Sequence, residues 1–147
     1  MRATVLAIGF LIGALVLGVM LLPEGEVATL STFAEGGAPQ ETAVWVVEGD
    51  GLGGAGELFL RTGPRTAWLG RLRANPAVKL ARGGEQRAYV AKPEDDAELR
   101  SRVNLAMADK YGLADRVISA FFDPAHAVPI RLVPDPTRKP AADASPH

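Results

Sequence analysis

Residues 3–22, close to the amino terminus, carry no charge and are almost wholly aliphatic. As a helix rising about 1.5 Å per residue, such a run is roughly 30 Å long, which matches the hydrocarbon core of a bilayer. A signal peptide has a shorter apolar stretch and a small-residue cleavage site, and neither is found here. The sequence therefore predicts a single transmembrane helix over residues 3–22. A cleaved signal and a buried core helix are the alternatives.

Charges flanking this run favour an amino terminus inside the cell, with Arg2 on one side and Glu24 on the other. Because only one basic residue carries this argument, the side of the soluble part stays open. Gly9 and Gly13 form a G-x-x-x-G spacing that lets two helices approach. The alternative is a glycine tolerated against lipid.

Two segments have no periodic pattern that would bury apolar surface. Residues 23–40 mix Pro, Gly, Ser and acids, which predicts a linker. Residues 135–147 are rich in Pro and Ala, which predicts a disordered tail. We therefore expect residues 41–134 to form the folded domain.

Short runs rich in β-branched, aromatic and alternating residues predict strands in this domain. Residues 42–47 and 58–61 form a strand pair around a glycine-rich loop, 49–56, and residues 77–81 and 86–91 form a hairpin around Gly83-Gly84. Residues 128–132 alternate as a closing strand. The loop matches G-x-G-x-x-G, but a strand follows it, so a dinucleotide site is rejected.

A helical period replaces the alternation between the hairpin and the last strand. Leu99, Val103 and Met107 recur at helical spacing after a cluster of acids, Gly112 ends this helix, and residues 114–121 form a second one. Asn75-Pro76 has the pattern of a helix stop followed by a strand. The predicted fold is mainly β with two helices (α+β), arranged as a small closed or half-closed antiparallel barrel.

Composition excludes several kinds of site. The formal net charge of −1 argues against a nucleic-acid binder, and the absence of cysteine excludes thiolate chemistry. The sequence predicts no metal site, and no residue is singled out as catalytic. His126 is a possible base, although an exposed loop histidine is the alternative.

Basic residues gather between Arg61 and Arg87, where seven bases face one acid, Glu85. The pattern Leu-Arg-Thr-Gly-Pro-Arg-Thr within this stretch offers guanidinium, hydroxyl and backbone donors for a phosphate or carboxylate. A solvated basic face is the alternative. Trp45 and Trp68 can stack on a planar ring or belong to the core.

The segment Leu58 to Leu80, above all Trp68 to Val78, and the later Val128-Pro-Ile-Arg-Leu-Val-Pro134 resemble the split β-barrel flavin-binding superfamily. Within this pyridoxamine-phosphate-oxidase-like group, they are most similar to the deazaflavin-dependent nitroreductase and quinone reductase family. The resemblance implies a six-stranded, commonly dimeric split barrel that binds FMN or a deazaflavin. The cofactor-binding residues implied are Arg61, Thr62, Arg65, Thr66, Trp68, Arg71 and Asn75.

Taken together, these features predict a membrane-anchored, single-pass oxidoreductase that uses a flavin or deazaflavin to pass hydride to a quinone, nitro or similar acceptor. The expected partners are the cofactor, the acceptor, the lipid bilayer and a second copy of the chain. Gly-Pro-Arg-Thr at residues 63–66 departs from that family's Gly-Arg-Lys-Ser type of run. A non-catalytic split barrel that binds a flavin, haem or nothing is therefore the alternative.

Overall fold

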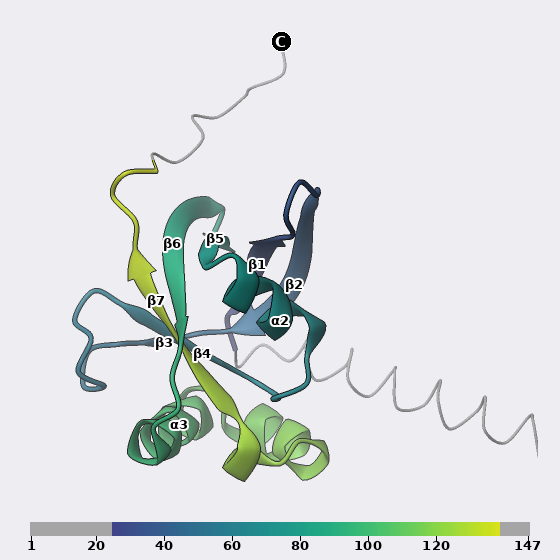
Figure 1. Ribbon diagram of the computed structural model, residues 1–147. Coiled ribbons are helices and arrows are strands. Elements are labelled where there is room, and N and C mark those ends of the chain that lie inside the picture. The colour runs from purple at the N-terminus through teal and green to yellow at the C-terminus, as the bar shows by residue number, and fades with distance from the viewer. Residues whose placement is uncertain (1–24, 139–147) are drawn as a thin grey trace, which may run out of the picture.

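The computed structural model describes residues 25–138, which fold into one antiparallel sheet with helices on two sides (Figure 1). The strands are β1 (Val27–Phe33), β2 (Pro39–Trp45), β3 (Val47–Glu48), β4 (Leu58–Thr62), β5 (Ala77–Arg82), β6 (Glu85–Pro93) and β7 (Val128–Pro134). The helices are α2 (Ala67–Ala74), α3 (Ala97–Phe121) and the short 3₁₀ turn η1 (Pro124–His126). The predicted mainly-β fold with an antiparallel half-barrel is confirmed.

The predicted transmembrane helix, residues 3–22, lies outside the described residues, as does most of the predicted tail. Between residues 25 and 138, no helix combines the length and the apolar character needed to span a bilayer.

The sheet curls because its two edge strands are consecutive in the chain. The strand order is β2-β1-β5-β6-β7-β4-β3, and only Val46 separates β2 from β3. Residues 39–45 pair with β1 at one edge, and residues 47–48 pair with β4 at the other. One extended segment thus joins both edges, so the sheet has to bend into a half-barrel.

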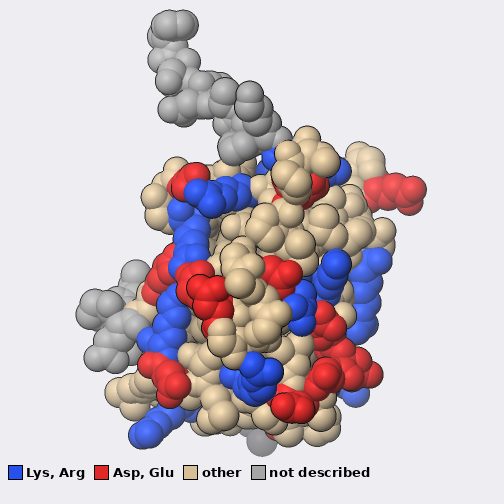
Figure 2. Space-filling view, turned by 90° about the vertical axis from the view of Figure 1, so that its left-hand side faces the viewer, with Lys and Arg blue, Asp and Glu red and all other residues tan. Residues whose placement is uncertain are grey.

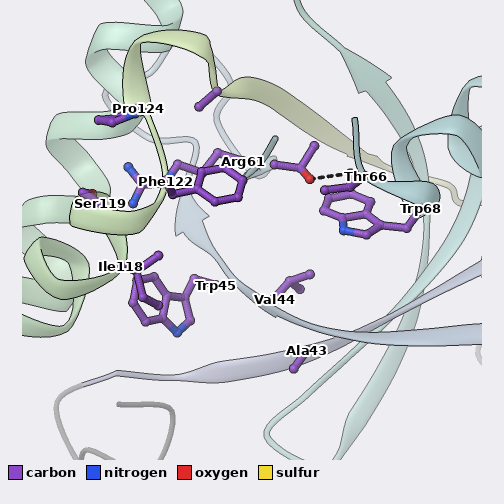
Figure 3. A pocket seen from close by; sticks show the side chains of 12 residues that line it. Ala43, Val44, Trp45, Arg61, Thr66, Trp68, Ile118, Ser119, Phe122 and Pro124 are labelled. Atoms are coloured by element: carbon purple, nitrogen blue, oxygen red, sulfur yellow. Dashed lines mark hydrogen bonds between the residues drawn. The ribbon is translucent and has the colours of Figure 1, made fainter. Parts of the chain in front are cut away.

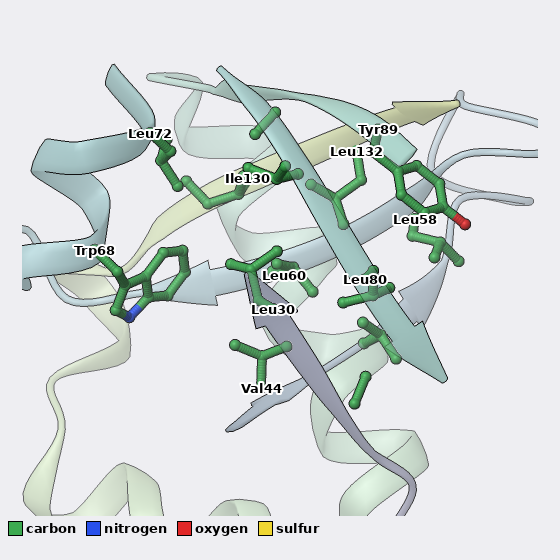
Figure 4. Packing of buried hydrophobic residues seen from close by; sticks show 14 of the residues in the cluster. Leu30, Val44, Leu58, Leu60, Trp68, Leu72, Leu80, Tyr89, Ile130 and Leu132 are labelled. Carbon is green, nitrogen blue, oxygen red and sulfur yellow. The ribbon is translucent and has the colours of Figure 1, made fainter. Parts of the chain in front are cut away.

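Inward-facing residues from six strands and α2 fill this half-barrel (Figure 4). Leu30, Leu60, Leu80, Ile130 and Leu132 are all at most 1% exposed. Fully burying each such side chain stabilises the fold by about 1.5–3 kcal/mol. A second cluster, built on Phe59 of β4 and the inner face of α3, covers the outside of the sheet.

Tyr111 contacts the chain at Val46, between the edge strands β2 and β3. Its ring is fully buried, stacks on Trp45 with centroids 4.4 Å apart, and lies so close to Gly25 that a Cβ there would be 2.4 Å from Cδ1. Its hydroxyl accepts a hydrogen bond from the Val46 N–H at 3.0 Å and lies 2.8 Å from the Glu26 carbonyl oxygen. The Val46 carbonyl accepts from the Lys110 ammonium at 2.7 Å, so the phenol proton is free to satisfy Glu26.

The predicted two helices occur as one element with a kink. Asp96 accepts a hydrogen bond from the Leu99 N–H at 3.0 Å and begins α3. Gly112 has φ +50° and ψ −119°, which interrupts the helix between Tyr111 and Leu113. Glycine has no Cβ and reaches this conformation without strain. The predicted break at Gly112 is therefore confirmed, as a kink after which the helix continues.

Three sequence predictions need correction. The linker over residues 23–40 is wrong for residues 27–33, which form β1 between β2 and β5, and for residues 39–40, which begin β2. Small and hydroxyl residues in VATLSTF hide an alternation in which Ala28 and Leu30 point into the core. Residues 42–47 belong to two strands rather than one, since the chain pairs with β1 before Val46 and with β4 after it. The sheet therefore has seven strands, against the six implied by the resemblance, and α2 is a helix that was foreseen only by its stop at Asn75-Pro76.

Replacing Tyr111 with Phe is expected to lower the free energy of unfolding by about 1–3 kcal/mol, because the buried Val46 N–H and Glu26 carbonyl lose their partner. Urea unfolding followed by circular dichroism measures this loss. Tyr89→Phe is the matched control, since the Tyr89 hydroxyl makes no hydrogen bond within the described residues. Equal stability of the two variants would contradict the closure role of Tyr111.

Stability is expected to fall in acid through Glu26. The side-chain hydrogen bond from Arg82, with a further one from Lys110, holds the pKa of Glu26 below its ordinary 4.5. Since the folded state then binds the proton less readily than the unfolded state, this contribution is complete above pH 4.5 and is lost as the pH falls through the lowered pKa. Urea unfolding of the wild type and Glu26→Gln across this range tests it: the difference in stability between them should shrink in acid.

Candidate functional site

A pocket of about 200 Å³ opens where β2 and β4 diverge (Figure 3). Both edges of the curled sheet contribute to it, together with the start of α2 and the second half of α3. Its lining comprises Ala43, Val44, Trp45, Arg61, Thr62, Thr66, Trp68, Ile118, Ser119, Phe122, Pro124 and Ala127. Most of these side chains are apolar, and both tryptophans of the chain are among them.

Arg61 brings a charge to this apolar pocket, but the charge is compensated. Its guanidinium forms an ion pair with Asp115 and donates to the Asn104 side-chain oxygen at 3.0 Å. The Arg61 and Asp115 side chains are 12% and 7% exposed. Asn104 in turn donates to the Pro124 carbonyl at 2.9 Å. This buried cluster ties β4 to both halves of α3 and to η1.

Thr62 and Thr66 place two hydroxyls on the pocket wall. Their oxygens are 2.7 Å apart, and the Thr66 hydroxyl also donates to the Gly63 carbonyl at 3.3 Å. Thr66 occupies the N-cap position of α2, yet its side chain caps no amide. Among the described residues, the first-turn amides of α2 therefore have no side-chain cap, and they carry the positive end of the helix dipole.

A wider groove of about 410 Å³ adjoins the pocket and shares Thr66 and Phe122 with it. The ring of Phe122 lies against Gly63, where a Cβ would come within 2.6 Å of Cζ, so only glycine leaves room for it. Arg65 lines this groove, is exposed, and forms no ion pair with any residue from 25 to 138.

His126 and Asp123 stand at the far end of the groove. The imidazole Nδ1 lies 2.6 Å from the Asp123 carboxylate, and this hydrogen bond keeps the pKa of Asp123 below its usual value. Both side chains are exposed. The pair closes the turn into η1, because Asp123 also accepts from the Ala125 N–H at 3.0 Å.

The structure brings together five of the seven residues predicted to bind a cofactor. Arg61, Thr62, Thr66 and Trp68 line the pocket, and Arg65 lines the groove with Thr66. Trp68 also belongs to the core, which is one of its two alternatives, and its stacking on a planar ring stays a prediction.

Arg71 and Asn75 lie outside both linings. The Arg71 Nε donates to the Thr32 hydroxyl at 2.9 Å, and the Asn75 side-chain oxygen accepts from the Ala77 N–H at 3.2 Å. Their role in cofactor binding stays a prediction.

Sequence reasoning missed the wall that the second half of α3 provides. Asp115, Ile118, Ser119 and Phe122 recur at intervals of three and four, which places them on one helix face. That spacing was available in the sequence. The strand that this face meets was not, because β4 lies more than fifty residues earlier.

The basic residues between Arg61 and Arg87 do not form one patch. Arg82 pairs with Glu26 and Glu48, and Arg87 pairs with Glu85. Figure 2 shows positive and negative side chains interspersed on one face of the molecule. In the described part of the chain, no group of three or more acidic or histidine side chains is arranged to hold a metal ion.

Comparisons with known proteins define the fold. No family model and no curated protein matches the sequence. Many solved structures do match, and three of them illustrate the range. A candidate pyridoxamine 5′-phosphate oxidase of Listeria innocua has 18% identity, a TM-score of 0.55 and an alignment over 82% of this chain and 90% of that one. The same values are 22%, 0.53, 79% and 91% for an F420 reductase, and 15%, 0.52, 75% and 81% for an FAD-binding protein of Mesorhizobium loti. These neighbours are split-barrel proteins of the pyridoxamine-phosphate-oxidase kind, and this chain has their fold.

Breaking the Arg61–Asp115 pair is expected to destabilise the protein, since removing one partner leaves a buried charge uncompensated. Arg61→Ala and Asp115→Ala should each lower the free energy of unfolding by about 3–5 kcal/mol, and the double variant by clearly less than the sum. Urea denaturation of the four proteins forms the cycle. Arg65→Ala is the control and should stay within about 0.5 kcal/mol of wild type. Additive losses would contradict the coupling.

Proposed function

We propose that this chain binds a flavin-type cofactor, FMN or a deazaflavin, at the split between β2 and β4 and acts as an oxidoreductase. The observation that carries the proposal is an apolar pocket, walled by both tryptophans, that adjoins a groove holding Arg65, which forms no ion pair within residues 25–138. The fold supports it, since an FAD-binding protein and an F420 reductase share the same architecture.

The apolar part of the site fits a planar heteroaromatic ring. Val44, Trp68, Ile118 and Phe122 offer flat or branched apolar surface, and the Thr62 and Thr66 hydroxyls supply a few polar atoms. Small-molecule sites have this composition and occupy about 300–1,000 Å³. The pocket alone is smaller, but the adjoining groove brings the site into that range.

The groove fits the phosphate of such a cofactor. Arg65 is free to form bidentate hydrogen bonds with phosphate oxygens, and the uncapped first turn of α2 favours an anion beside it. Arg61 has a different role, because Asp115 and Asn104 already engage its guanidinium. It positions the pocket wall, whereas Arg65 and Thr66 would hold the phosphate.

Hydride chemistry is what the cofactor supplies when bound, and the protein supplies orientation and exclusion of water. Trp68 and Phe122 exclude water from the pocket, and Thr62 and Thr66 orient a polar edge. The acceptor, a quinone, nitro or similar compound, would enter along the apolar side of the groove at Phe121 and Phe122. We further propose that residues 3–22 anchor the chain in a bilayer, which concentrates a lipid-soluble acceptor.

Fluorescence of Trp45 and Trp68 tests cofactor binding directly, because the chain has no other tryptophan and both line the pocket. The full chain, solubilised in detergent, is titrated with FMN, FAD, a deazaflavin cofactor and haem. Saturable quenching is expected with FMN or the deazaflavin. Arg65→Ala should weaken binding roughly 10- to 100-fold, as expected for loss of a charged hydrogen bond of about 1.5–3 kcal/mol.

Arg73→Ala is the matched control, since Arg73 is also an exposed arginine, in the last turn of α2, but lines neither the pocket nor the groove. Its affinity should equal that of the wild type. Quenching by haem alone, or by none of the four compounds, would overturn the flavin proposal and favour a non-catalytic module. Flavin binding without reduction of any quinone or nitro acceptor would overturn the enzyme assignment only.

A further inference from the structure

The second half of α3 has two chemically different faces. Ala114, Asp115, Ile118 and Ser119 point toward the barrel and the pocket. The opposite face presents Leu113, Arg116, Val117, Ala120 and Phe121. Leu113 is 62% exposed and Phe121 is 67% exposed. A helix in contact with water usually has a polar outer face, and here a single arginine interrupts an apolar one.

Exposed apolar side chains concentrate around this face. Within residues 25–138, the large hydrophobic residues that remain exposed are Val27, Leu105, Leu113, Phe121 and Phe122. Leu113 and Phe121 belong to the face, and Phe122 follows it directly. Val27 is next to Glu26, whose carboxylate accepts from Lys110 at 3.2 Å, so it also lies near the kink. Only Leu105 belongs to the first half of α3.

The described chain begins beside the same kink. Gly25 lies against the ring of Tyr111, two residues before Leu113. Residues 3–22 are the uncharged apolar run, and only Pro23 and Glu24 separate Leu22 from Gly25. An extended chain covers at most about 3.6 Å per residue, so Leu22 and Gly25 are at most about 11 Å apart. A bilayer that holds residues 3–22 is therefore close to the kink at Gly112, where this half of the helix begins.

We propose that the outer face of residues 113–121 rests in the interface of a lipid bilayer. Helices of this kind place apolar side chains below the headgroups, while an arginine extends its charge toward them. The inference rests on the membrane anchor in the proposed function. It gives the groove a defined entrance, because Phe121 belongs both to this face and to the groove lining. An acceptor dissolved in the bilayer then meets the groove without crossing water.

Single cysteines test this contact without background, because the chain contains none. Leu113→Cys and Phe121→Cys are labelled with an environment-sensitive fluorophore in the full chain, reconstituted into phosphatidylcholine–phosphatidylglycerol vesicles. Gln86→Cys, at the exposed β5–β6 turn, is the water-facing control. Leu105→Cys is the matched control, an equally exposed leucine of the same helix. Lipids brominated along their acyl chains serve as quenchers.

Labels at 113 and 121 should shift their emission to the blue and lose most of their intensity in brominated vesicles, while labels at 86 and 105 stay unchanged. Unquenched labels at 113 and 121 on a chain that floats with vesicles would overturn the contact and leave the anchor intact. A chain that does not float would overturn both. A blue shift that grows with the protein-to-lipid ratio without quenching would mean that a second copy covers the face. Cofactor binding is read separately by tryptophan fluorescence, so its failure is distinguishable from each of these results.

Discussion

The hydroxyl of Tyr111 satisfies the backbone at the one position where the curled sheet changes pairing. At Val46 the chain leaves β1 and joins β4, and its buried amide belongs to neither ladder. An unpaired amide there would cost a large part of the net stability of a domain of this size. The phenol supplies the partner, and the stacking on Trp45 together with the close contact at Gly25 fixes its position. On the β2 side of this point the chain does not pair with β4, and the pocket lies between these two strands.

The same closure explains the electrostatics of the pocket. Arg61 stands on β4 where the strand separates from β2, and Asp115 reaches it from the second half of α3. The ion pair fixes the helix that forms the outer wall and leaves the pocket without net charge. A ligand with an apolar ring and an anionic end would therefore place its ring in the pocket beside the tryptophans and its anionic end in the groove at Arg65.

Local patterns predicted what depends on neighbours in the sequence. The β5–β6 hairpin, the acidic start of α3 and the break at Gly112 follow from alternation, capping and glycine. β1 escaped prediction because small and hydroxyl residues hide its alternation, and its place in the sheet depends on pairing with β2 at one edge and with the distant β5 at the other. The local sequence likewise pointed to Arg61 and Thr66 as site residues. It could not reveal that Asp115 forms an ion pair with Arg61, or that Ile118 and Phe122 form the opposite wall of the pocket, because these contacts join distant parts of the chain.

The contact that closes the half-barrel also has a place in the order of folding. Val46 and Tyr111 are 65 positions apart, and contacts this distant form slowly because the loop between them has to be closed first. While the chain is being synthesised, β2 can pair with β1 long before residue 111 emerges. Until β7 (Val128–Pro134) has emerged as well, β4 pairs with no strand but β3, so the nascent domain carries unpaired strand edges, the feature that favours pairing between molecules. The nascent chain is thus most exposed to pairing with another copy of itself between the synthesis of Val46 and that of β7.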